Sequence, residues 1–173
     1  MPPQSFWDFS LAFYALPGVP DACLELQDRA GVDVNVMLYL LYAALEGRML
    51  APADVERIEA VARPWRQAVV VPLRSVRRAL KEPVGAFEPA RSAALRSDVK
   101  RIELAAERLQ QEALEALVPP VALGSPQSDP VACAGNNLRL YAQRLPCWQA
   151  QPAERILASF AAYAGGALRS REW

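Results

Sequence analysis

The most apolar stretch of the chain runs from Val34 to Leu45 and contains no charged residue, although Asp33 precedes it and Glu46 follows it. These twelve residues are too few for a membrane-spanning helix, which needs about twenty. A helix that is apolar on all sides has no face for solvent, so other elements must surround it. The pattern therefore predicts a buried central helix that Asp33 caps and Gly47 ends.

Amphipathic segments before this run supply apolar faces that would cover it. Ser5 and Asp8 have the spacing of a helix-capping pair and predict a first helix that ends at Leu16. A second helix is predicted from Pro20 to about Gly31, because proline favours the first turn and glycine favours the position after the last turn. The first helix is aromatic on much of its circumference, so we expect it to pack against the central one.

A third helical region opens at Pro52 and continues on helical spacing to Leu80. Pro64 and Pro72 interrupt it, and an interior proline removes a backbone hydrogen bond, so we expect kinks or short breaks at both. A fourth, long helix is predicted from about Ala90 to Val118. Its apolar residues recur at threes and fours like a heptad seam, namely Leu95, Val99, Ile102, Ala106, Leu109, Ala113 and Leu117.

We expect this seam to pack against an antiparallel helix of the same chain, and a homodimer that shares the seam is the alternative. Residues 119–137 differ in composition from the helical segments before them, since they contain four prolines and two glycines. The sequence predicts one all-α domain of about six to seven helices. Its parts are a helical core at 1–118, a Pro-rich loop at 119–137, and C-terminal helices at 138–173 that pack on the core and end in a mobile tail. We expect Asn136 or Asn137 to cap a helix that begins at Leu138, and a last helix at 152–164 that frays at Gly165 and Gly166.

The composition narrows the chemistry. The 173 residues include no histidine, the commonest general base and metal ligand, so we expect neither a cofactor nor a metal. Nineteen basic residues balance nineteen acidic ones, so no overall field attracts a membrane or nucleic acid. Cys23, Cys133 and Cys147 form no C-x-x-C pair and indicate reduced thiols in the cytoplasm, with a Cys133–Cys147 bridge as the less favoured alternative. The N-terminus lacks a basic leader, which also favours a cytoplasmic location.

The sharpest local charge feature is a group of four basic residues, the basic helix face: Arg74, Arg77, Arg78 and Lys81. On a helix these residues fall within one sector of about 100°. No Asp or Glu occurs between Ala60 and Lys81. The pattern predicts a contact surface for an acidic protein partner or an anionic ligand.

Two ordinary interpretations of the basic helix face stay open. The face could be solvated, or it could be neutralised by acidic residues of neighbouring helices, namely Glu25, Asp28, Glu103 and Glu107. Nucleic acid is not the expected partner, because no aromatic side chains interleave with these charges.

Two further polar pairs have ordinary explanations. Asp33 and Asn35 could line a ligand site, but a cap at Asp33 and a bond from Asn35 to a nearby backbone group are the favoured interpretation. Glu103 and Glu107 lie one helical turn apart. Metal-binding carboxylates in helical bundles use Glu-x-x-His, so salt bridges to the basic helix face are favoured here.

No nucleophile with a partner base and no Gly-rich phosphate loop is evident in the sequence. The leading hypothesis is a non-enzymatic interaction or adaptor protein whose basic helix face contacts an acidic partner. The alternative is a small-molecule binder that holds an anionic ligand in a pocket beneath that face. An enzyme of unknown type comes third.

Several stretches resemble a known family: 6–11, 14–19, 26–35, 64–66, 71–74 and 77–81. They read FWDFSL, YALPGV, LQDRAGVDVN, PWR, VPLR and RRALK. Together they resemble an uncharacterised proteobacterial family that is known only as a domain of unknown function. The resemblance covers roughly the first half of the chain. It implies a small cytosolic helical protein of Gram-negative bacteria and assigns no catalytic residues.

Overall fold

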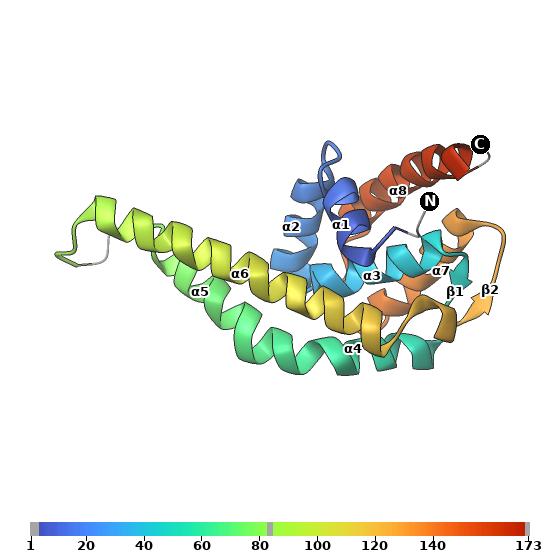
Figure 1. Cartoon of the computed structure of the whole chain (residues 1–173), viewed down its shortest axis with the longest axis horizontal. Coiled ribbons are helices and arrows are strands. Elements are labelled where there is room, and N and C mark those ends of the chain that lie inside the picture. The colour runs from blue at the N-terminus through green and yellow to red at the C-terminus, as the bar shows by residue number, and fades with distance from the viewer. Residues whose placement is uncertain (1–3, 83–84, 172–173) are drawn as a thin grey trace.

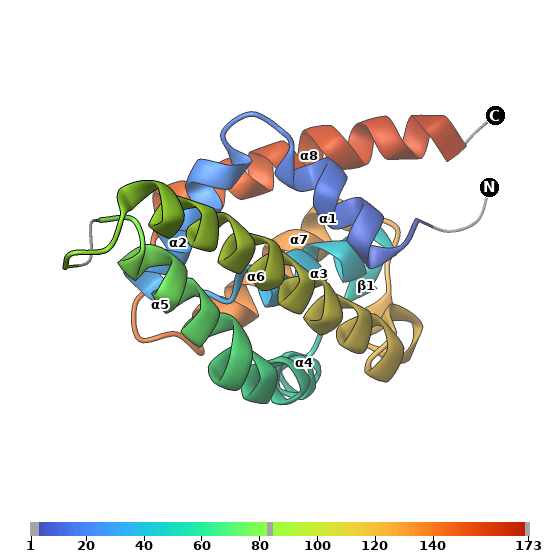
Figure 2. The same cartoon turned by 60° about the vertical axis from the view of Figure 1, so that its left-hand side comes forward.

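Helix α3 (Val34–Leu45) lies at the centre of the molecule, as the apolar run predicts. Figures 1 and 2 show it enclosed by α1 (Phe6–Tyr14), α4 (Pro52–Trp65), α6 (Pro89–Leu117) and α7 (Pro130–Ala142). All its residues from Asn35 to Leu45 are buried. The cap is confirmed, because Oδ1 of Asp33 accepts the backbone N–H groups of Asn35 and Val36 at 3.0 and 3.4 Å.

The computed structural model describes residues 4–82 and 85–171. It is 76% helical, so the predicted all-α class is confirmed. The remaining elements are α2 (Val19–Ala30), β1 (Arg48–Met49), the π-helix η1 (Arg66–Val70), α5 (Val71–Ala79), the 3-10 helix η2 (Pro120–Ala122), β2 (Ser125–Pro126) and α8 (Ala150–Arg171). The two strands pair antiparallel over two residues each.

Helices α4 and α5 are joined end to end by η1, so the region from Pro52 onward forms one long bent rod. The π-helix lies between Pro64 and Pro72, where the sequence predicts interruptions, and a π-turn is a common site of helix bending. This rod runs beside α6, and the outer ends of α5 and α6 project from the body as a hairpin (Figure 1). The long helix therefore packs within its own chain.

The buried face of α6 differs from the predicted heptad seam. Four apolar seam residues are 47–62% exposed: Leu95, Ile102, Leu109 and Leu117. Three polar residues, Glu103, Gln110 and Gln111, are at most 5% exposed. The prediction was wrong at these positions because it counted only apolar side chains, whereas polar ones pair with each other inside this molecule.

Helix α7 begins at Pro130, not at Leu138 as predicted, so the expected loop is shorter. Asp129 caps it by accepting backbone N–H groups at 2.9 and 3.1 Å, and Pro130 suits the first helical position. Asn137 is therefore a mid-helix residue and caps nothing. It is fully buried and ties α7 to the middle of α3 and to β1.

Helix α8 packs beside α2 and α7 and continues through Gly165 and Gly166, where the sequence predicts fraying. The predicted mobile tail coincides with the end of this helix as far as Arg171, and its last residues, Glu172 and Trp173, lie outside the described residues. The three cysteines are free thiols. Within residues 4–82 and 85–171, no helix combines the length and apolarity that crossing a membrane requires.

Candidate functional site

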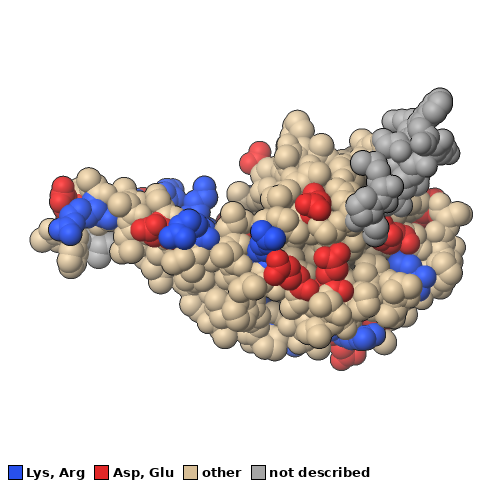
Figure 3. Space-filling model, viewed as in Figure 1, with Lys and Arg blue, Asp and Glu red and all other residues tan. Residues whose placement is uncertain are grey.

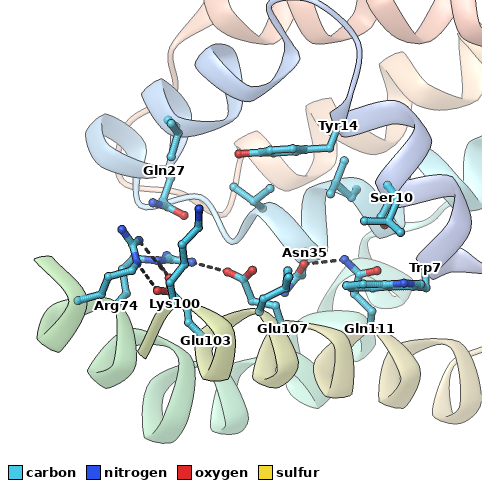
Figure 4. A pocket seen from close by; sticks show the side chains of 16 residues that line it. Trp7, Ser10, Tyr14, Gln27, Asn35, Arg74, Lys100, Glu103, Glu107 and Gln111 are labelled. Carbon is cyan, nitrogen blue, oxygen red and sulfur yellow. Dashed lines mark hydrogen bonds and ion pairs between the residues drawn. The ribbon is translucent and has the colours of Figure 1, made fainter. Parts of the chain in front are cut away.

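The basic helix face is largely turned toward acidic residues of the same chain. Arg74 donates to Glu103 at 3.1 Å and to Glu107 at 2.9 Å. Arg77 forms a two-point ion pair with Glu103. These contacts join α5 to α6 along the inner side of the projecting hairpin (Figure 4).

The two outer members of the face behave differently. Arg78 donates to Asp28 of α2 at 2.6 Å, and both side chains are about half exposed. Lys81 lies just beyond α5, is exposed, and forms no ion pair with any described residue. On the surface view, basic side chains of the hairpin alternate with acidic ones and form no continuous patch of one sign (Figure 3).

Glu103 is the centre of this charge cluster and is only 5% exposed. Burial by itself would raise its pKa, but the hydrogen bonds and charges of Arg77 and Arg74 outweigh burial and hold the pKa below its usual value. Burial raises the pKa of Glu107, and the charge of Arg74 opposes that shift only in part. The pKa values of two carboxyl groups one helical turn apart are therefore shifted in opposite directions.

A pocket of about 480 Å³ opens directly beside this cluster. Helices α1, α2, α3, α5 and α6 line it. Figure 4 shows Gln27, Arg74 and Lys100 at one end of the pocket and Trp7, Ser10 and Gln111 at the other. Between them the wall is mainly apolar, with Leu11, Leu24, Val34, Leu38 and Leu104.

The charged end of the pocket carries a net positive charge. Arg74, Arg77 and Lys100 face Glu103 and Glu107, so three cations minus two carboxylates leave one positive charge. Lys100 is exposed and forms no ion pair with any residue of the described ranges. Its ammonium is the cationic group of the pocket that is not already committed to a carboxylate.

A chain of buried polar side chains runs under the pocket from the cap of α3. Arg66 lies 3.5 Å from Oδ2 of Asp33, which also accepts from Nε2 of Gln110 at 2.9 Å. Asn35 donates to Gln110 at 2.9 Å and accepts from Gln111 at 2.8 Å. Asn35 thus bonds to side chains, and the predicted bond from its side chain to the backbone was wrong.

Two atoms at the far end of the pocket are buried without a hydrogen-bond partner: Oγ of Ser10 and Oε1 of Gln111. Each residue is 4% exposed. Buried polar atoms without a partner are rare because desolvating them costs free energy. The third such atom among the described residues, Nε of Arg96, lies on α6 about four turns before Gln111.

Sequence reasoning did not find Ser10, Gln110 or Gln111. Gln110 does share helical spacing with the buried Ala106 and Leu114, so a search for polar residues on that face would have found it. Nothing local in the sequence distinguishes Ser10, because its importance comes from the helix that packs opposite it.

The geometry thus defines an all-α protein with an amphiphilic pocket between its N-terminal helices and a long helical hairpin. Residues 5–114 match the model of a protein family described as "Protein of unknown function (DUF2390)". The match covers more than half of the chain, so the chain belongs to this family. All residues that line the pocket lie inside the matched region. Comparisons with curated proteins and with solved structures gave no match.

Proposed function

We propose that this protein binds a small amphiphilic molecule with an anionic group in the pocket between α1, α3 and α6. The single observation that carries the proposal is the pocket itself, which has apolar walls, one net positive end and two unpartnered polar atoms at the other end. Concave, mainly apolar sites with a few directed polar groups are the usual form of ligand sites.

The anionic group belongs at the charged end of the pocket, which Lys100 and Arg77 help to line. Both glutamates there are already hydrogen-bonded to arginines, so Lys100 adds a charge that nothing in the described part of the chain neutralises. A carboxylate or phosphate at this end would form charge-assisted hydrogen bonds with it. The pocket follows α6 from Lys100 to Gln111, about 16 Å of helix at about 1.5 Å per residue, which suits an elongated ligand.

That the basic helix face contacts an acidic partner stays a prediction, and the surface left for such a contact is smaller than the whole face. Arg74 and Arg77 are engaged with buried Glu103, so an outside partner would compete with these internal ion pairs. The remaining members of the face, Arg78 and Lys81, are the exposed ones. Charge reversal at these two positions tests that hypothesis without disrupting the cluster around Glu103.

We propose binding and not catalysis, because no nucleophile in the pocket is hydrogen-bonded to a base. Ser10 is the one hydroxyl of a serine in the lining, and it has no partner among the described residues. Nucleophilic catalysis by serine requires an adjacent base. We expect this binding to take place in the cytoplasm, which is the compartment that the reduced cysteines predict.

The test uses decanoate, a medium-chain carboxylate, as the probe. We expect it to raise the melting temperature in proportion to its concentration and to bind measurably in titration calorimetry. Lys100→Gln should weaken this binding by about threefold to tenfold, because it removes one partly desolvated ion pair.

The chain offers a matched control, because its other lysine is Lys81, outside the pocket. Lys81→Gln removes the same charge and should change the affinity by less than about twofold. Absence of decanoate binding, or equal loss in both lysine variants, would contradict the proposal.

A further inference from the structure

The buried polar side chains beneath the pocket form a row of hydrogen bonds that all run in one donor-to-acceptor direction. That direction specifies which hydrogen-bonding group the ligand must carry at one end. We infer that the end of the pocket near Gln111 accepts a hydrogen-bond donor, so the ligand carries an uncharged O–H or N–H group at the opposite end from its anionic group. This inference rests on the proposed function, and it deepens that function by naming the chemistry of the ligand's second end.

The direction begins at Asp33. In every described hydrogen bond of its carboxylate, the carboxylate is the acceptor. Oδ1 accepts the first-turn N–H groups of α3, and Oδ2 accepts Nε2 of Gln110. Burial raises the pKa of Asp33, and the charge of Arg66 and these hydrogen bonds oppose that shift in part. In its ionised form the carboxylate accepts and cannot donate. Gln110 must therefore turn its amide nitrogen toward Asp33 and its carbonyl oxygen away.

Each following amide is then fixed by the one before it. Oε1 of Gln110 faces Asn35 and needs a donor, so Asn35 turns Nδ2 to it. Oδ1 of Asn35 faces Gln111 and accepts from Nε2 of Gln111. Reversing any single amide would bring two oxygens or two NH₂ groups together in a buried site, where the cost is high.

The row of hydrogen-bonded amides therefore ends on Oε1 of Gln111, an acceptor to which no described group donates. Oγ of Ser10, across the same end of the pocket, also lacks a partner. Both atoms are almost completely covered, so a ligand group reaches them only when the side chains over this end of the pocket shift aside. A ligand hydroxyl can donate to Gln111 and accept from Ser10, which satisfies both atoms at once.

An acceptor-only group at this position would leave Gln111 unsatisfied. An ether or carbonyl oxygen would face Oε1 with its own lone pairs, and a methyl group would leave the acceptor desolvated and unpaired. Sites that hydrogen-bond a hydroxyl reject analogues without one for this reason.

The experiment compares three acids of equal chain length: ω-hydroxydecanoate, ω-methoxydecanoate and decanoate. All three share the carboxylate, and the first two share an oxygen at the far end, but only the first has a donor there. We expect the wild-type protein to bind ω-hydroxydecanoate about tenfold more tightly than ω-methoxydecanoate in titration calorimetry. The hydroxy acid gains one hydrogen bond, and it does not leave Oε1 of Gln111 buried without a donor.

Asp33→Asn tests the origin of the direction. Asparagine keeps the capping oxygen for α3 and adds an NH₂ group that can donate to Gln110, so the whole chain of amides is free to reverse. Gln111 would then turn its NH₂ group toward the pocket. We expect the preference for the hydroxy acid over the methoxy acid to fall below about threefold or to invert.

Ser10→Ala provides a second variant that does not touch the cap. It removes a donor that the far-end oxygen of either acid can accept, so it should weaken ω-hydroxydecanoate and ω-methoxydecanoate by about threefold to tenfold and leave decanoate within about twofold. Circular dichroism and thermal unfolding confirm that each variant is folded. These results do not depend on Asp33→Asn being stable, because the wild-type comparison already tests the donor requirement.

The outcomes separate the two proposals. If all three acids bind equally, or if the methoxy acid binds best, the donor requirement is wrong and the binding function stands. If none of the three binds, the proposed function fails, and the inference about its ligand fails with it. A preference for the hydroxy acid that Asp33→Asn leaves unchanged would overturn the role of the amide chain.

Discussion

Ser10 has the features of a residue that the fold itself does not need. Its hydroxyl is buried without a partner, so Ser10→Ala should leave the free energy of unfolding unchanged or raise it by up to about 1 kcal/mol. Ser5→Ala on the same helix is the matched control. Ser5 caps α1 by accepting the backbone N–H of Asp8 at 3.1 Å, so its loss should cost about 1 kcal/mol. Urea unfolding of both variants measures the contrast, and a Ser10→Ala loss equal to that of Ser5→Ala would contradict it.

Asn137 is the opposite case, a buried polar residue with every bond satisfied. Its amide nitrogen donates to the carbonyl groups of Leu40 and Arg48 at 3.2 and 3.1 Å, and its oxygen accepts from Leu50 at 2.9 Å. Asn137→Asp would place a carboxylate against two carbonyl oxygens at a position with no exposure. We expect a loss of about 3–5 kcal/mol in urea unfolding, because an unpaired buried charge is strongly destabilising.

The neighbouring Asn136 serves as the control for that change. It is half-buried, and its amide donates to one backbone carbonyl, that of Leu50, at 2.9 Å. Asn136→Asp should therefore cost less, about 1–2 kcal/mol. Equal losses at the two positions would show that burial of Asn137 is not the cause.

At the scale of elements, the contact of α5 with α6 should depend on pH in two opposite ways. The pKa of Glu103 lies below the ordinary 4.5, so its ionised form stabilises the folded protein. That contribution is complete above pH 4.5 and is lost as the pH falls through the lowered pKa. The pKa of Glu107 lies above 4.5, so its contribution is present below pH 4.5 and is lost as the pH rises through the raised pKa.

Urea unfolding between about pH 3 and pH 7.5 tests these signs through two variants. The stability difference between wild type and Glu103→Gln should be largest at neutral pH, about 2–4 kcal/mol, and shrink on acidification. Between wild type and Glu107→Gln, the wild type should be relatively most stable in acid and lose that advantage as the pH rises. Slopes of the same sign for both variants would contradict the assignment.

The sequence predicts elements well where local chemistry determines them. The apolar run of α3, its cap at Asp33 and the glycine after α2 are local features, and the structure confirms all three. The ion pairing of the basic helix face with Glu103, Glu107 and Asp28 was one of the alternatives that the charge pattern left open.

The errors arise where distant residues decide the outcome. Gln110 and Gln111 are buried because Asn35, 75 and 76 positions away in the chain, pairs with them. No periodicity of apolar residues reports such a pairing. The early start of α7 is a different error, since Asp129 and Pro130 are a local start signal inside a segment whose prolines suggest a loop.

At the scale of the whole molecule, the pocket and the core have different extents. The pocket lies entirely within residues 5–114, the part that matches the family. The apolar core continues into α7 and α8, which contribute Leu138, Tyr141 and Phe160 at no more than 2% exposure. The segment that carries the candidate function therefore depends on a C-terminal segment outside the match.

This dependence predicts that a fragment of residues 1–118 will not fold on its own. Removal of α7 would expose the side of α3 that packs against it and would leave the N–H of Asp33 without its acceptor, the hydroxyl of Tyr141 at 3.0 Å. Each large apolar side chain that loses its cover costs about 1.5–3 kcal/mol, and several such losses exceed a total stability of about 5–15 kcal/mol. We expect the fragment to bind a hydrophobic dye and to unfold without a cooperative transition. A separately produced fragment of residues 119–173 should restore near-ultraviolet circular dichroism when added, and cooperative unfolding of 1–118 alone would show that the matched segment carries its own core.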